Sequence, residues 1–161
     1  LVQQQDRRFT ADALLARAYD ALAAREPRLA LEQLEAAQQR HPNHPSIDAA
    51  LALALSEAGV DAYNRGQNSA AAELWQASVR MQAINPMPWY GLALSHLRER
   101  RFDDAARCLD QIARLQRYLG YRRLVVGSQA VVVRSWAALQ RGDLVTAHAL
   151  YSQSLHPETW R

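Results

Sequence analysis

The chain has 161 residues, of which 49% are apolar, and it carries a formal net charge of +3. A chain of this length and composition can bury a core, which excludes a disordered polar protein. All nineteen basic residues are arginine, which excludes chemistry that needs a Schiff-base or phosphate-binding lysine. Ala and Leu dominate over six Gly and six Pro, so we expect an all-α fold.

Residues 1–8 are polar and contain neither an initiator Met nor the apolar core of a signal peptide. We therefore expect either a mature chain or an excerpt of a longer one, and we favour the excerpt. The compartment stays open between bacterial cytoplasm and periplasm, because Cys108 is the only cysteine and a lone thiol is tolerated in both. The apolar stretches fall far short of the roughly 20 residues that cross a bilayer, so no membrane span is expected.

From Ala11 onward a 34-residue unit recurs, with small or large residues at its positions 4, 8, 20, 24 and 27. In the first copy, 11–44, these are Leu14, Ala18, Ala30, Leu34 and Ala37. In the second, 52–85, they are Leu55, Gly59, Ala71, Trp75 and Ser78, and in the third, 86–119, they are Trp89, Ala93, Ala105, Leu109 and Ile112. The fourth and weakest copy, 128–161, has Val131, Ser135, Ala147, Tyr151 and Ser154. Small residues at positions 8 and 20 let two antiparallel helices approach closely, while the large ones fill the space between hairpins.

The spacing of the copies indicates two similar halves. The copies start at residues 11, 52, 86 and 128, so 11–85 and 86–161 each hold two hairpins. The extra segments 45–51 and 120–127 amount to about two helical turns, and we interpret them as extensions of the following helices, a loop being the alternative. The valine-rich stretch 124–133 has a strand-like composition and is the least typical of a helix.

Two turns between paired helices carry glycine. Gly66 and Gly142 lie where a helix needs a left-handed residue at its end. Asn68 and Asp143 are then expected to cap the helices that follow.

With these positions, most specifically those of the third copy, the chain resembles the tetratricopeptide repeat (TPR) family over nearly its whole length. The resemblance implies a right-handed superhelical, TPR-like solenoid of about four antiparallel helix pairs, forming a single domain over 1–161. HEAT-like and half-a-TPR repeats are the second choice, because their lengths and positions match less well. TPR proteins usually act as scaffolds, adaptors or chaperones that bind a peptide or protein surface, mainly with the first helix of each pair.

The family's groove positions, carried over residue by residue, fall largely on aromatic and aliphatic side chains. They are Leu15, Tyr19 and Leu22 in the first copy, Val60, Tyr63 and Asn64 in the second, Met87, Tyr90, Leu94, Leu97 and Arg98 in the third, and Val132, Trp136, Leu139 and Gln140 in the fourth. The partner-binding residues expected from this set are Tyr19, Tyr63, Asn64, Tyr90, Leu94, Arg98, Trp136 and Gln140. Such a lining suits an amphipathic helix or an extended apolar segment. For each position the alternative is packing against the neighbouring repeat.

The leading functional hypothesis is a scaffold or co-chaperone that holds a protein partner in this groove. Similar arrays occur in bacterial secretion, envelope and polysaccharide-export assemblies, which is an analogy of architecture. TPR domains that grip the acidic C-termini of chaperones share a clamp of Lys and Asn, and this chain has no Lys and only Asn64 there, so that ligand is excluded. Leu155 and Trp160 in an uncapped last helix favour either further chain, a covering partner or self-association.

The second hypothesis rests on an arginine-rich segment. Residues 98–161 carry eleven Arg against six acidic residues, whereas 1–97 carry eight against ten. Nucleic acid or an anionic surface could bind there. The interspersed Glu99, Asp103, Asp104 and Asp110 favour a solvated outer face instead, and no regular RNA-reading code recurs in the repeats.

The third hypothesis, an enzyme, has little support in the sequence, and we expect none, nor any cofactor or metal. His41 and His44 flank a Pro-Asn turn without Cys or acidic residues at ligand spacing. His96 and Cys108 could form a base and nucleophile, but on a helical hairpin their spacing is better explained by coincidence. Cys108 is expected to be a packing residue.

Overall fold

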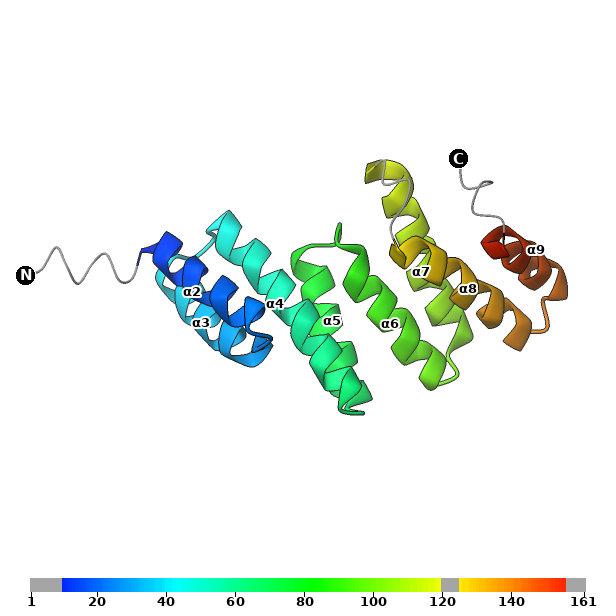
Figure 1. The fold of residues 1–161 in the computed structure, drawn as a ribbon, viewed down its shortest axis with the longest axis horizontal. Coiled ribbons are helices and arrows are strands. Elements are labelled where there is room, and N and C mark those ends of the chain that lie inside the picture. The colour runs from blue at the N-terminus through cyan, green and yellow to red at the C-terminus, as the bar shows by residue number, and fades with distance from the viewer. Residues whose placement is uncertain (1–9, 120–124, 156–161) are drawn as a thin grey trace, which may run out of the picture. The chain divides into compact units, whose positions relative to one another are not determined.

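The structure is a computed structural model that describes residues 10–119 and 125–155, with side chains described over 10–115 and 131–150. Every regular element in this part of the chain is an α-helix (Figure 1). The helices are α2 (Ala11–Ala23), α3 (Pro27–Arg40), α4 (Pro45–Asn64), α5 (Asn68–Met81), α6 (Pro86–Arg98), α7 (Phe102–Leu119), α8 (Val125–Gln140) and α9 (Leu144–Leu155).

The chain forms two compact units, Leu1–Ala83 (unit 1) and Ile84–Arg161 (unit 2). In unit 1, α2 packs on α3, α3 on α4 and α4 on α5, and the two first helices α2 and α4 also touch. In unit 2, α6, α7, α8 and α9 pack in the same succession, and α6 touches α8. Each unit therefore contains two helical hairpins, and the boundary falls two residues from the predicted division at 85/86. The single domain over 1–161 stays a prediction.

Two of the long elements bear on the predicted extensions. α4 begins at Pro45, so residues 45–51 form its first two turns. Of the second segment, residues 120–124 lie outside the described residues, and 125–127 belong to α8. The strand-like composition of the valine-rich stretch was misleading, since from Val125 onward it is helical. Valine fits a helix at a modest loss of side-chain freedom when its neighbours supply packing.

The turns inside the hairpins confirm both glycine predictions. Gly66 and Gly142 have φ of +78°, in the left-handed region. The prediction for Asp143 is also confirmed, because its carboxylate accepts the Thr146 N–H at 3.1 Å and caps α9. The prediction for Asn68 is wrong: α5 begins at Asn68 and its N-cap residue is Gln67, without a side-chain cap. In this turn geometry the residue directly after the glycine caps the next helix, and Asn68 stands one residue too late.

The cores of the first three hairpins join a small residue to a large one, as the repeat predicts. Ala18 with Leu34 and Ala93 with Leu109 are all buried. The tightest case is Gly59, where an added Cβ would lie 2.5 Å from Nε1 of the buried Trp75. The same indole N–H donates to the Ser56 carbonyl at 3.1 Å, which fixes its orientation. Close approach of α4 and α5 therefore depends on the missing side chain.

Candidate partner-binding faces

Helix α8 in unit 2 carries a row of exposed apolar side chains. Val132, Trp136 and Leu139 are 50%, 46% and 50% exposed. Their spacing of four and three residues places them on one face of the helix, whereas Ala137 and Ala138 are buried on the other. Three half-exposed large apolar residues in one row form a patch that water solvates poorly.

The apolar row on α8 is held in place at its centre. The Trp136 ring meets the Phe102 ring edge to face, with centroids 6.3 Å apart and planes at 83°. Phe102 packs in turn against the buried cluster of Leu97, Ala105 and Ala137. Trp136 is therefore held on one side and open on the other, which suits a binding anchor with little freedom to lose.

Helix α6 contributes a gradient of exposure along the predicted groove positions. Met87 is exposed, Tyr90 and Leu94 are half-buried, and Leu97 is buried. Arg98 ends the helix and is exposed. Leu97, and Leu15 in α2, are core residues, so for these two positions the packing alternative is correct and groove lining is wrong. Each faces a neighbouring helix, which the repeat position alone does not reveal.

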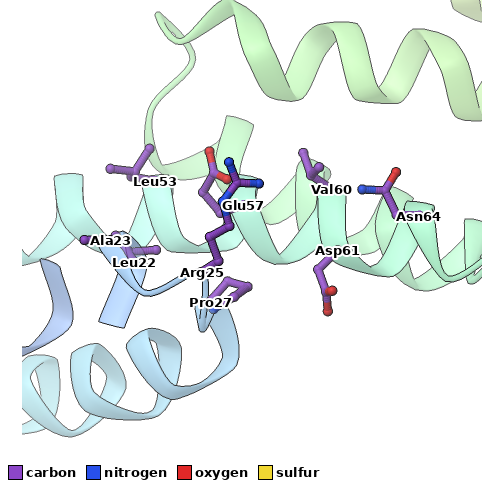
Figure 2. A pocket seen from close by; sticks show the side chains of 9 residues that line it. All are labelled: Leu22, Ala23, Arg25, Pro27, Leu53, Glu57, Val60, Asp61 and Asn64. Atoms are coloured by element: carbon purple, nitrogen blue, oxygen red, sulfur yellow. The ribbon is translucent and has the colours of Figure 1, made fainter. Parts of the chain in front are cut away.

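Unit 1 contains a pocket of about 500 Å³ between the α2–α3 turn and α4 (Figure 2). Leu22, Leu53 and Val60 give it apolar walls. The polar side chains in its lining are Arg25, Glu57, Asp61 and Asn64. Arg25 reaches from the turn toward Glu57 on α4, and Asp61 is bonded to Arg65 at 3.1 Å. The pocket thus combines apolar walls with a mixed, slightly acidic set of charges.

The structure brings some predicted residues together and separates others. Asn64 lines the unit 1 pocket with Leu22 and Val60, whereas Tyr19 does not line it and is exposed elsewhere on α2. Tyr63 is half-buried against the Trp75 ring, with centroids 5.6 Å apart. In unit 2, Gln140 is exposed at the end of α8, beyond the apolar row. Partner contact by these residues stays a prediction.

The sequence interpretation missed Leu53, Arg25 and Glu57 as pocket residues. Leu53 stands at position 2 of the second copy, which is itself a groove position, and is 36% exposed. Glu57 lies one helical turn further on the same face of α4. Arg25 had no sequence signal, because arginine is not a typical residue of a left-handed turn.

Within the described residues, the interspersed acids of the arginine-rich segment form ion pairs with some of its arginines. Asp104 pairs with Arg107, Asp110 with Arg134 at 2.7 Å, and Asp103 with Arg141 at 3.2 Å. The hydrogen bond from Arg107 holds the pKa of Asp104 below its ordinary value. The arginine-rich segment therefore offers fewer unpaired positive charges than its composition suggests.

His96 and Cys108 do not form a base and nucleophile. No hydrogen bond joins them in the part of the chain that the structure describes, and the His96 Nδ1 faces the Arg101 guanidinium at 2.8 Å. Burial raises the pKa of the Cys108 thiol to about 11, Asp104 adding to the effect and Arg107 opposing it. A thiol with so high a pKa is a poor nucleophile at neutral pH. Cys108 is buried, as a packing residue would be.

Neither a metal site nor a membrane span is found among the described residues. Over residues 10–119 and 125–155, no group of three His, Cys, Asp or Glu side chains is placed to hold a metal ion. Within the same ranges, no helix has both the length and the apolar character needed to cross a bilayer.

Comparison with known proteins agrees with the helical repeat. A family model described as tetratricopeptide repeat matches residues 56–118 and 90–159. No protein with curated annotation matches the sequence. The fold is similar to a crystal structure of MamA, with a TM-score of 0.63 and 15% identity over 98% of this chain and 83% of that one. A second MamA structure gives 0.62 and 14% over 96% and 76% of the two chains.

A further similar structure is MamA from residue 41 to its end from Desulfovibrio magneticus RS-1, with a TM-score of 0.53 and 13% identity over 92% and 95%. At such identities the likeness concerns the fold. The expected fold class, an all-α array of TPR-like helix pairs, is confirmed.

Proposed function

Because this chain belongs to the tetratricopeptide repeat family, we propose that it is an interaction scaffold that holds an amphipathic helix or apolar segment of a partner protein on its first helices. The family and fold support a protein-interaction scaffold in general. The finer assignment rests on one observation: Val132, Trp136 and Leu139 form an exposed apolar row on the first helix of the fourth hairpin.

The geometry of the row suits the apolar face of a partner helix better than a polar segment. Side chains spaced by four and three residues along α8 present one continuous ridge, into which a partner's own apolar ridge can pack. Met87, 43% exposed, and the half-buried Tyr90 lie on α6, which packs beside α8 in the same unit. Trp136 and Tyr90 are of the residue types that dominate binding energy at interfaces.

The test is affinity capture from a lysate of the source cell, comparing the native chain with a variant carrying Met87→Ala, Trp136→Ala and Leu139→Ala. A control variant removes three exposed apolar side chains from second helices, namely Leu29→Ala, Met81→Ala and Val145→Ala. Both variants are first checked for helical content and cooperative unfolding.

We expect a protein partner that withstands moderate salt, is retained by the control variant and is lost by the first-helix variant. Equal retention by both variants would remove the basis for the assignment. Secretion, envelope and polysaccharide-export assemblies are the first places to look for the partner.

Nucleic-acid binding through the arginine-rich half is the second candidate. Its signature in the same capture is material that is lost steeply as salt rises, because phosphate contacts release counterions. The pairing of Asp103, Asp104 and Asp110 with arginines weighs against it.

A further inference from the structure

All four hairpins turn through one left-handed residue, yet only two of them use glycine. Arg25 and Arg100 each have φ of +60°, at the places that Gly66 and Gly142 occupy in the other hairpins. The bonding is the same: Arg100 N–H donates to the Leu97 carbonyl at 3.1 Å, as Gly66 N–H does to the Tyr63 carbonyl at 2.9 Å. A residue with a Cβ costs about 1–2 kcal/mol in this conformation, which glycine avoids. Strain of this kind is retained at functional positions more often than elsewhere.

Arg100 lines a cavity of about 380 Å³ in unit 2, at the α6–α7 turn and the end of α8. The charged side chains of its lining are four arginines and two aspartates, namely Arg100, Arg101, Arg107, Arg141, Asp103 and Asp104. The lining therefore has an excess of two positive charges. An anion entering this cavity would be attracted from several sides.

Three of the four arginines already have partners. Arg101 pairs with Glu99 at 2.7 Å, Arg107 with Asp104, and Arg141 with Asp103 at 3.2 Å. Arg100, by contrast, is exposed and forms no ion pair in the part of the chain that the structure describes. The paired side chains fix the walls, and Arg100 keeps its guanidinium donors available.

The equivalent arginine in unit 1 lies in the opposite environment. The pocket lined by Arg25 also holds Glu57 and Asp61, so its charged lining has one more acid than base, apart from Arg65 outside it. Glu57 on α4 lies where the Arg25 side chain points in Figure 2, so Arg25 faces an acid inside its own pocket, at a distance longer than that of an ion pair. The pocket lined by Arg100 has a surplus of arginine instead, which favours an anionic ligand.

We propose that this arginine pocket binds a carboxylate from an acidic segment of the partner protein, with Arg100 as the main donor. The inference rests on the proposed function, because Phe102 lines the pocket and also touches Trp136, which joins the pocket to the apolar row on α8. A partner segment lying along the row can therefore place an acidic side chain at its end into the pocket. A guanidinium can bind such a carboxylate through two parallel hydrogen bonds.

A polyanionic backbone fits this pocket less well than a carboxylate. Asp103, whose side chain is 79% exposed, and Asp104 line the same cavity. They pair with Arg141 and Arg107, so the lining leaves one unpaired guanidinium, which matches a single carboxylate but not the successive phosphates of a nucleic acid. The site lies at a hairpin turn and uses Arg, so it differs from the Lys and Asn clamp of groove helices that the sequence excludes.

The test uses a fluorescein-labelled hexaglutamate peptide as the probe, measured by fluorescence anisotropy at low salt against the whole chain. The key variant is Arg100→Gly, which removes the guanidinium and also relieves the left-handed strain, so it is expected to fold at least as well as the native chain. Arg25→Gly is the matched control, because it relieves the same strain in unit 1. Hexaglutamine and a 12-nucleotide oligothymidine serve as comparison probes.

We expect Arg100→Gly to bind hexaglutamate about tenfold more weakly than the native chain, and Arg25→Gly to bind it equally well. Unchanged binding by Arg100→Gly, equal binding of hexaglutamine, or tighter binding of oligothymidine would each overturn the proposal. The variant with Met87, Trp136 and Leu139 changed to Ala should still bind hexaglutamate. Failure of the pocket can thus be told from failure of the apolar row, which the capture experiment tests separately.

Discussion

The two units share one repeat plan but differ in where they keep polar and apolar groups. In unit 1 the tight contact is internal, with Gly59 beneath Trp75, and the exposed pocket carries its own opposing charges, Arg25 and Glu57. In unit 2 the apolar row on α8 is open, and the pocket lined by Arg100 holds more arginines than acids. The comparison teaches that repeats with one backbone plan can carry different surfaces, and under our proposal the surface of unit 2 is the one that binds a partner.

The largest expected effect is on the internal contact of unit 1. Gly59→Ala should lower the free energy of unfolding by about 2–3 kcal/mol, because the new Cβ overlaps the Trp75 indole and α4 and α5 must move apart. Urea denaturation followed by circular dichroism measures the loss. The double variant Gly59→Ala with Trp75→Leu copies the Ala and Leu pairs of the first and third hairpins and should recover much of it. No recovery would show that the contact is not a simple exchange of volume between two positions.

The second prediction concerns unit 2, which holds the only cysteine. Because burial raises the pKa of Cys108 from 9.0 to about 11, the thiolate fraction near neutral pH falls by about 100-fold. Folded protein should therefore react with a thiol reagent at pH 8 at least that much more slowly than urea-unfolded protein. Similar rates in the two states would contradict the burial of this side chain.

The third prediction exchanges the turn residues between hairpins. Arg25→Gly and Arg100→Gly should each raise the free energy of unfolding by about 0.5–1 kcal/mol, the relief of left-handed strain being partly offset by the greater freedom of glycine in the unfolded chain. Gly66→Ala and Gly142→Ala should each lower it by about 1 kcal/mol. Thermal unfolding of the four single variants gives the signs, and a loss of stability in either Arg→Gly variant would mean that the arginine side chain itself stabilises the turn.

The sequence predicted the repeating features of this fold and little of what is peculiar to one repeat. The positions of Gly59 and Trp75, the turns at Gly66 and Gly142, and the Asp143 cap all follow from one frame, because each depends on local chain geometry. The strained arginines could be found only by aligning the turns with one another, since arginine has no preference for such positions. The burial of Leu97, at a groove position of the frame, depends on the neighbouring helices.

The smallest expected effect distinguishes the turn of the third hairpin from the other three. In every turn the N–H of the N-cap residue donates to the carbonyl of the residue five positions earlier. That residue is His96 in the third hairpin and an alanine in the others, namely Ala21, Ala62 and Ala138. Arginine can only donate, so the His96 Nδ1 accepts from Arg101 and must carry no proton there. Aligning the four turns in the sequence would have shown a histidine at this position in the third hairpin and an alanine in the others.

Protonation of His96 should weaken unit 2. Burial first, and then the charge of Arg101, lowers the pKa of His96 below its ordinary value of 6.5, with Arg107 acting in the same direction and Asp104 and Glu99 opposing. Between the lowered pKa and 6.5 the unfolded chain therefore binds more protons than the folded one. Stability is then highest above pH 6.5, falls as the pH drops through this window, and this contribution levels off below the folded pKa.

The comparison that isolates this effect is His96→Asn, whose amide oxygen can accept from Arg101 but does not titrate. We expect the difference in unfolding free energy between native chain and variant to shift against the native chain as the pH falls from 7.5 to 5, while the other histidines cancel. A difference that is constant over this range would show that His96 is solvated in solution and that its contact with Arg101 does not stabilise the turn of the third hairpin.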